Sequence, residues 1–163
     1  MYHPVFDPYH TILRILEILV YGNGDGYTKN QIRIMDFYLS FPEFVKDIKT
    51  TRSLMYKKKS VSPETNKYYT PDERKAVFIQ MEEIHEAALR VLVTSGIVGS
   101  EEGRYFVITD ELTGSLEDLV QQRIQETKEV LDVLIELADQ TPPIGEGSLK
   151  DRTGLLEHRY DVG

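Results

Sequence analysis

The 163-residue sequence contains no cysteine. This absence excludes disulfide bonds, thiolate zinc sites and cysteine nucleophiles, and it is compatible with a reducing compartment. Long hydrophobic runs are also missing, because the most apolar window, Ile12 to Tyr21, is too short to cross a membrane and contains Arg14 and Glu17. The first ten residues lack the basic start, apolar core and cleavage site of a secretory signal. We therefore expect a cytoplasmic protein without membrane contact.

Short motifs of common enzymes are equally scarce. The sequence has no Gly-x-Ser-x-Gly and no Ser-x-x-Lys, and its glycine-rich stretch, Gly22 to Gly26, lacks the Lys-Ser/Thr pair of a nucleotide-binding loop. Glu82 and His85 form one Glu-x-x-His unit, but di-iron helix bundles use two such units, and the second is absent. We interpret His85 as a surface or boundary residue, with a metal role as the alternative. We predict no enzymatic activity, no metal site and no cofactor.

Charge of both signs is present, but it is unevenly distributed. The formal net charge is −8. Residues 46–75 contain nine Lys or Arg and four Asp or Glu, which gives this segment a charge of +5. The rest of the sequence carries a charge of −13. The length and composition suit one globular domain, which we place at residues 1–140, followed by a polar C-terminal tail at 141–163.

Apolar periodicity predicts a mainly α-helical fold. Residues 9–21 are apolar around nearly every side, which indicates a central helix, and the capping-box spacing of Thr28 and Gln31 predicts a second helix over about 29–41. The sequence Thr70-Pro71-Asp72-Glu73 predicts a third helix start, with a buried face that continues until Gly96. A long C-terminal helix of about 24 residues follows from Ser115.

Residues 96–109 predict a short β-hairpin between the third helix and the C-terminal helix. Two hydrophobic segments flank a turn that contains Gly103, an arrangement typical of a winged helix-turn-helix. Wings that contact DNA usually present Lys or Arg to phosphate groups, whereas this turn carries Glu101 and Glu102 beside a single Arg104. We therefore predict that these three residues face a protein partner.

The basic region predicts a second contact surface. The segment from about residue 49 to residue 70 lacks apolar periodicity, and we interpret it as a long exposed loop. Its lysines can bind phosphate or an acidic protein surface, and its tyrosines add contact area, although three lysines on a loop can also serve solubility alone. The partner-binding residues that we predict on this loop are Tyr56, Lys57, Lys58, Lys59, Tyr68 and Tyr69.

One family resemblance rests on the N-terminal third of the chain. Asp7-Pro8-Tyr9 leads into a leucine-rich helix, Asp36-Phe37-Tyr38 lies in the second helix, and Phe41-Pro42 leads to a further helical segment. Over roughly residues 4–50 this pattern resembles the small middle component of bacterial ABC three-component systems, a family that includes the accessory subunit of Lamassu-type defence complexes. The resemblance implies a winged-helix adaptor between a structural-maintenance-type (SMC) ATPase and an effector, often a nuclease, and it implies no catalytic residues.

Two functional hypotheses from different classes remain. The first is a non-catalytic adaptor that links an SMC/Rad50-like ABC ATPase to an effector in an anti-phage or anti-plasmid complex, with DNA contacted only through the complex or the basic loop. The alternative is a free-standing winged-helix transcriptional regulator, which would bind DNA tightly, selectively and with strong salt dependence. A small hydrolase would need an unrecognised carboxylate site.

Overall fold

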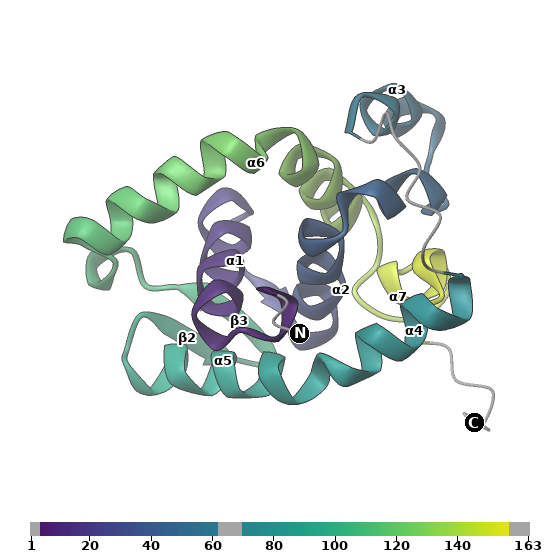
Figure 1. Cartoon of the computed structure of the whole chain (residues 1–163). Coiled ribbons are helices and arrows are strands. Elements are labelled where there is room, and N and C mark those ends of the chain that lie inside the picture. The colour runs from purple at the N-terminus through teal and green to yellow at the C-terminus, as the bar shows by residue number, and fades with distance from the viewer. Residues whose placement is uncertain (1–3, 62–69, 157–163) are drawn as a thin grey trace.

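A computed structural model describes residues 4–61 and 70–156 of the chain, and Figure 1 shows the arrangement of its helices and strands. In the described residues, helices form most of the structure and surround one small antiparallel sheet, as the sequence predicts. The elements, in chain order, are η1 (Pro4–Phe6), α1 (Pro8–Tyr21), β1 (Tyr27–Thr28), α2 (Lys29–Ser40), η2 (Pro42–Asp47), α3 (Arg52–Val61), α4 (Pro71–Gln80), α5 (Glu82–Thr94), β2 (Val98–Glu101), β3 (Arg104–Val107), η3 (Thr109–Glu111), α6 (Gly114–Gln140) and α7 (Leu149–Thr153).

Helix α1 occupies the centre of the protein. Its start is fixed by Asp7, whose side chain accepts a hydrogen bond from the backbone N–H of Tyr9, and by Pro8 at the first helical position. Helices α2, α5 and α6 pack around it, so Ile15, Leu16 and Ile18 are fully buried. The all-round apolar pattern therefore predicted the position of this helix correctly.

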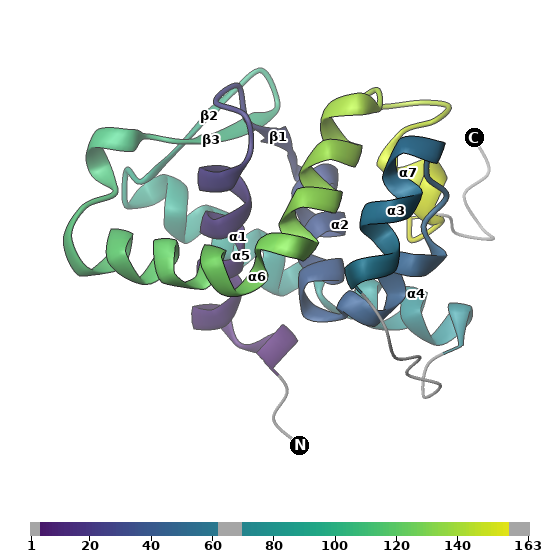
Figure 2. The same cartoon turned by 90° about the horizontal axis from the view of Figure 1, so that it is seen from above.

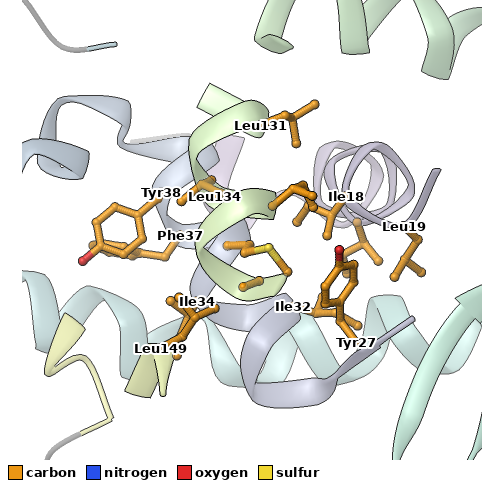
Figure 3. Close-up of a cluster of buried hydrophobic side chains, with 14 of the residues drawn as sticks. Ile18, Leu19, Tyr27, Ile32, Ile34, Phe37, Tyr38, Leu131, Leu134 and Leu149 are labelled. Carbon is orange, nitrogen blue, oxygen red and sulfur yellow. The ribbon is translucent and has the colours of Figure 1, made fainter. Parts of the chain in front are cut away.

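The core continues from α1 into α2, α6 and α7. Figure 3 shows side chains from these helices and from β1 meeting in one buried cluster. The labelled members are Ile18, Leu19, Tyr27, Ile32, Ile34, Phe37, Tyr38, Leu131, Leu134 and Leu149. Within the described residues, no helix is both long and apolar enough to traverse a lipid bilayer.

Two capping boxes that the sequence predicted are present. At the start of α2 the Thr28 hydroxyl accepts a hydrogen bond from the backbone N–H of Gln31, whose side chain accepts one from the Thr28 N–H. Thr70 and Glu73 make the same reciprocal contacts at the start of α4. Both pairs satisfy backbone donors that would otherwise lack partners in the first helical turn.

The sheet joins the N-terminal third of the chain to the predicted hairpin. Its strand order is β1-β3-β2, with Tyr27 opposite Tyr105 in one pair and Val98 opposite Val107 in the other. The order of α1, β1, α2, α5 and the β2–β3 hairpin is compatible with the predicted winged helix-turn-helix. Helices α3 and α4 are inserted between α2 and α5.

Two details of the predicted helix pattern were wrong. Residues 52–61 form helix α3 rather than part of an exposed loop over about 49–70. The single helix expected from Pro71 to Gly96 is divided at Met81, where α4 ends and α5 begins. Phe78 of α4, Met81 at the break and His85 of α5 are all fully buried, so packing on both sides holds the two helices in place.

The segment after α6 contains a short docked helix. In α7 the Ser148 side chain accepts a hydrogen bond from the Asp151 N–H, and Gly154 ends the helix with a positive φ of 68°. Leu149 and Leu155 are buried, and α7 contacts α2. Residues 149–155 of the predicted polar tail are therefore packed on the rest of the chain.

Candidate protein-binding surfaces

The tip of the β2–β3 hairpin is acidic because its one arginine is used internally. Glu102 and Gly103 form the turn with positive φ values of 53° and 77°, a geometry typical of a two-residue hairpin turn. The Arg104 guanidinium donates hydrogen bonds to the backbone carbonyls of Gly26, at 2.8 Å, and Asp25, at 3.4 Å. Arg104 therefore ties the hairpin to the loop between α1 and β1, while Glu101 and Glu102 remain exposed.

The close approach of that loop to β3 requires glycine. Gly26 has a φ of 82°, and a Cβ at this position would lie 2.1 Å from the carbonyl oxygen of Tyr105. Any side chain at this position would collide with that carbonyl group unless the backbone moved. The hairpin is consequently held at a defined position relative to the end of α1.

A groove of about 320 Å³ lies between α5 and the sheet, and we call it the α5 groove. Its apolar wall contains Leu89, Val93 and Tyr105, while an ion pair between Lys29 and Glu86, with Nζ and Oε1 3.1 Å apart, lies at its edge. The complete lining is Lys29, Glu86, Leu89, Arg90, Val93, Thr94, Ser100 and Tyr105.

The outer face of α5 has a charge unsuited to DNA. In a DNA-binding winged helix, this helix enters the major groove between two rows of phosphates. Here Glu82 and Glu83 are exposed in its first turn, and the helix carries a single arginine, Arg90, while Glu86, one turn later, is paired with Lys29. Val91 is exposed on the same helix at 51%, which adds apolar area. Acidic and apolar side chains together favour a protein partner over nucleic acid.

Helix α3 presents only part of the predicted basic surface. Tyr56 is 81% exposed, and Lys59 is exposed beside it. Lys57 forms an ion pair with Glu136 of α6, with Nζ and Oε2 2.6 Å apart, and this hydrogen bond raises the pKa of Lys57. Lys58 donates a hydrogen bond to the backbone carbonyl of Ile48 at 2.9 Å.

The remaining residues of the prediction, Tyr68 and Tyr69, lie outside the described residues. Tyr56, Lys57 and Lys59 are thus the predicted side chains that α3 exposes, and Lys57 is paired with Glu136. Exposed Met55, at 44%, extends this surface. We call Met55, Tyr56 and Lys59 the α3 surface.

The hairpin and α3 lie at opposite ends of the molecule. Figures 1 and 2 show β2 and β3 at one end and α3 at the other in both orientations, with α1, α2 and α6 between them. The structure therefore does not bring the two predicted groups of residues together. It separates them into an acidic end and an end with exposed tyrosine and lysine.

A buried network of charged side chains links α1, α2 and α5. Asp36 of α2 is completely buried, and its carboxylate accepts hydrogen bonds from Arg14 Nε, at 2.6 Å, and from His85 Nε2, at 2.7 Å. Burial alone would raise the pKa of Asp36, but the charge of Arg14 and the contact with His85 outweigh it and hold that pKa below its usual value.

His85 is a fully buried member of this network, so its interpretation as a surface or boundary residue was wrong. The Arg33 Nε–H donates to His85 Nδ1 at 3.3 Å, and because arginine can only donate, the other ring nitrogen must carry the proton that faces Asp36. Both ring nitrogens are thereby occupied. Among the described residues, no group of three or more His, Cys, Asp or Glu side chains could hold a metal ion.

Sequence reasoning missed the α5 groove and the buried network. A signal for the groove exists, because Val93, which lines it, does not belong to the apolar stripe that faces the core through Ala88 and Leu92. The network had no comparable signal, since Arg14, Asp36 and His85 are separated by more than 20 residues along the chain. Their pairing follows from how the three helices pack.

The family model described as ABC-three component (ABC-3C) system Middle Component 5 matches residues 1–161. No curated protein and no solved structure matches significantly.

Proposed function

The chain belongs to the family of Middle Component 5 of ABC-three component systems, and from that membership we propose that it is a non-catalytic adaptor subunit. It links an SMC/Rad50-like ABC ATPase to an effector, of nuclease type, in a Lamassu-like complex that defends a bacterium against phage or plasmids. The protein partners follow from its place in a multi-component system. Their identity is part of the proposal.

One observation carries the adaptor role: the two candidate surfaces face different directions and differ in chemistry. The hairpin end offers Glu101, Glu102 and the α5 groove, whereas the other end offers the α3 surface. Opposite ends can contact two partners at once without steric conflict (Figures 1 and 2). Complementary charges on the partners would set the orientation in which each one binds.

An adaptor of this kind acts through differential affinity. It favours one arrangement of its partners only to the extent that it binds that arrangement more tightly, and each tenfold preference corresponds to about 1.4 kcal/mol. Rigid attachment of the hairpin through Gly26 and Arg104 suits this role, because a fixed surface loses little conformational freedom on binding.

Co-purification with the ATPase and effector encoded beside it tests the proposal. We expect the unmodified chain to recover both partners. A double variant, Glu101→Lys with Glu102→Lys, should lose one partner and keep the other, and Tyr56→Ala with Lys59→Glu should show the reverse pattern. Glu126→Lys with Glu129→Lys, a pair of exposed α6 carboxylates outside both surfaces, is the matched control and should keep both. A two-ended adaptor would be contradicted if each surface variant lost both partners, or if each kept both.

The element order favours a second candidate, the DNA-binding regulator, because it is compatible with a winged helix. The glutamates of α5 and of the hairpin tip oppose that function. Binding of the isolated chain to duplex DNA, measured at increasing salt, separates the two. Tight, sequence-selective binding that weakens steeply with salt would support the regulator, whereas weak binding alone and a stable complex with the ATPase are expected of the adaptor.

A further inference from the structure

A cavity of about 410 Å³ lies where α2, α4 and α7 meet, separate from both candidate surfaces. Tyr38 comes from α2, Asp47 from the end of η2, and Arg74 and Lys75 from α4. The complete lining is Tyr38, Asp47, Pro71, Arg74, Lys75, Thr153 and Leu155. Three of these residues carry charge, and they come from segments that only the folded chain brings together.

The hydroxyl of Tyr38 belongs to the lining of this cavity. The residue is only 4% exposed, and Figure 3 shows its oxygen pointing away from the buried cluster to which its ring belongs. No hydrogen bond from the described residues reaches that oxygen. Burial raises the pKa of Tyr38, so the hydroxyl stays protonated and can donate a hydrogen bond to a ligand.

Arg74 is held in place beside that hydroxyl. Its Nη1 lies 2.7 Å from Asp47 Oδ2, and its guanidinium carbon lies 4.1 Å from the centre of the Phe44 ring. Its Nε is buried and has no hydrogen-bond partner among the described residues. A buried donor in that position is costly unless a ligand or water supplies an acceptor.

The charges around the cavity sum to about +1. Arg74 and Lys75 contribute two positive charges, and Asp47 contributes one negative charge. A singly charged anion neutralises this balance, whereas a doubly charged phosphate would leave excess negative charge next to Asp47. Pro71 and Leu155 form apolar walls that suit a short hydrocarbon stem.

We propose that this cavity binds a single carboxylate group, that of an Asp or Glu side chain carried by a peptide. The Tyr38 hydroxyl, the free edge of the Arg74 guanidinium and the Lys75 ammonium group donate to its oxygens. Charge-assisted donors of this kind favour a carboxylate over a neutral amide of the same shape. The proposal does not depend on the adaptor role, because it rests on the cavity alone.

Nuclear magnetic resonance of the full chain tests the proposal directly. The probe is glutamate blocked at both ends, N-acetyl-glutamate α-amide, which carries one carboxylate, and the matched control is the corresponding blocked glutamine. We expect the glutamate probe to shift the Arg74 Nε–Hε and Lys75 amide signals in a saturable manner. Equal shifts with the glutamine probe, or none with either, would overturn the proposal. Tighter binding of inorganic phosphate at equal ionic strength would overturn the assignment to carboxylate.

Two variants locate the binding in the cavity. Tyr38→Phe removes only the hydroxyl and keeps the buried ring, and Lys75→Gln removes one charge from a partly exposed side chain. Each should weaken binding of the glutamate probe by about tenfold while the chain stays folded. Lys29→Gln, at the α5 groove, is the control and should leave that affinity unchanged. Unchanged affinity in both cavity variants would place the carboxylate elsewhere.

Discussion

At the junction of α1, α2 and α5 the charged side chains lie inside the protein, whereas those that join α3 to α6 lie at its surface. Asp36 and His85 are completely shielded from solvent. Lys57 and Glu136, in contrast, keep 53% and 31% of their side-chain area exposed. Removing one partner from a buried pair leaves an uncompensated charge, while an exposed pair can exchange its partner for water. The two junctions should therefore respond very differently to substitution.

The contrast also shows that different interactions hold α5 and α3 in place. The buried network links α1, α2 and α5 through groups that are all buried, Asp36 and His85 completely, so the position of α5 and its groove is strongly specified. Among the α3 side chains that the structure describes, Leu54 alone is buried. We therefore expect α3 to depend mainly on Leu54, with half-buried Val61 packed against the core, rather than on its lysines.

Asp36→Ala should have the largest effect. It leaves Arg14 and His85 without their shared acceptor inside the protein, which should lower the free energy of unfolding by about 3–5 kcal/mol. Urea denaturation followed by circular dichroism measures this loss. A loss similar to that of an exposed ion pair would mean that water reaches the network and that the two junctions do not differ.

Leu54→Ala should have the next largest effect. Truncation of a fully buried leucine creates a cavity, which should lower the free energy of unfolding by about 2–5 kcal/mol. The loss should mainly weaken the packing of α3 on the rest of the chain. Amide hydrogen exchange should become faster in α3 while α1 stays protected. Equal acceleration in both helices would show that α3 is as integral to the core as α1.

Acid should weaken the buried junction selectively. Because the pKa of Asp36 is lower in the folded chain than its ordinary value of 3.8, the folded state binds fewer protons than the unfolded state near that pH. The resulting stabilisation is fully present above pH 3.8 and disappears as the pH falls through the folded-state value. Asp36→Asn should reduce this pH dependence in denaturation curves, and an unchanged curve would contradict the assignment.

Lys57→Ala should have the smallest effect. The side chain is exposed, so water can replace its contact with Glu136 and the denaturation midpoint should stay within experimental error. Thermal melts of the variant and the unmodified chain, compared at low and high salt, measure this. A shift as large as that of Leu54→Ala would mean that the ion pair, and not the leucine, attaches α3.

Local signals allowed much of the fold to be predicted from the sequence. The apolar pattern of α1, both capping boxes and the glycine-containing hairpin depend on residues close together in the chain, and each was found where expected. The division at Met81 was missed because neither glycine nor proline marks it. Helix α3 was missed because a helix with one buried side chain shows no apolar period.

The candidate surfaces were harder to predict because their chemistry depends on distant neighbours. Arg104 was predicted to contact a protein partner, but its guanidinium donates hydrogen bonds to the backbone carbonyls of Gly26 and Asp25, which precede it by 78 and 79 residues. Lys57 and Lys58 were assigned in the same way, and each has a contact within the chain. Glu101, Glu102, Tyr56 and Lys59 stay exposed, and their role in binding remains a prediction.

The central position of α1 has a consequence for synthesis on the ribosome. This helix is synthesised long before α6, which covers one of its sides and begins only at Gly114. Tyr21 contacts Asp132 across 111 residues of sequence, and Tyr27 contacts Asp139 across 112. A nascent chain therefore exposes the leucine and isoleucine side chains of α1 to solvent until α6 has been translated. Cells that produce this protein have reason to shelter its early segments with a chaperone.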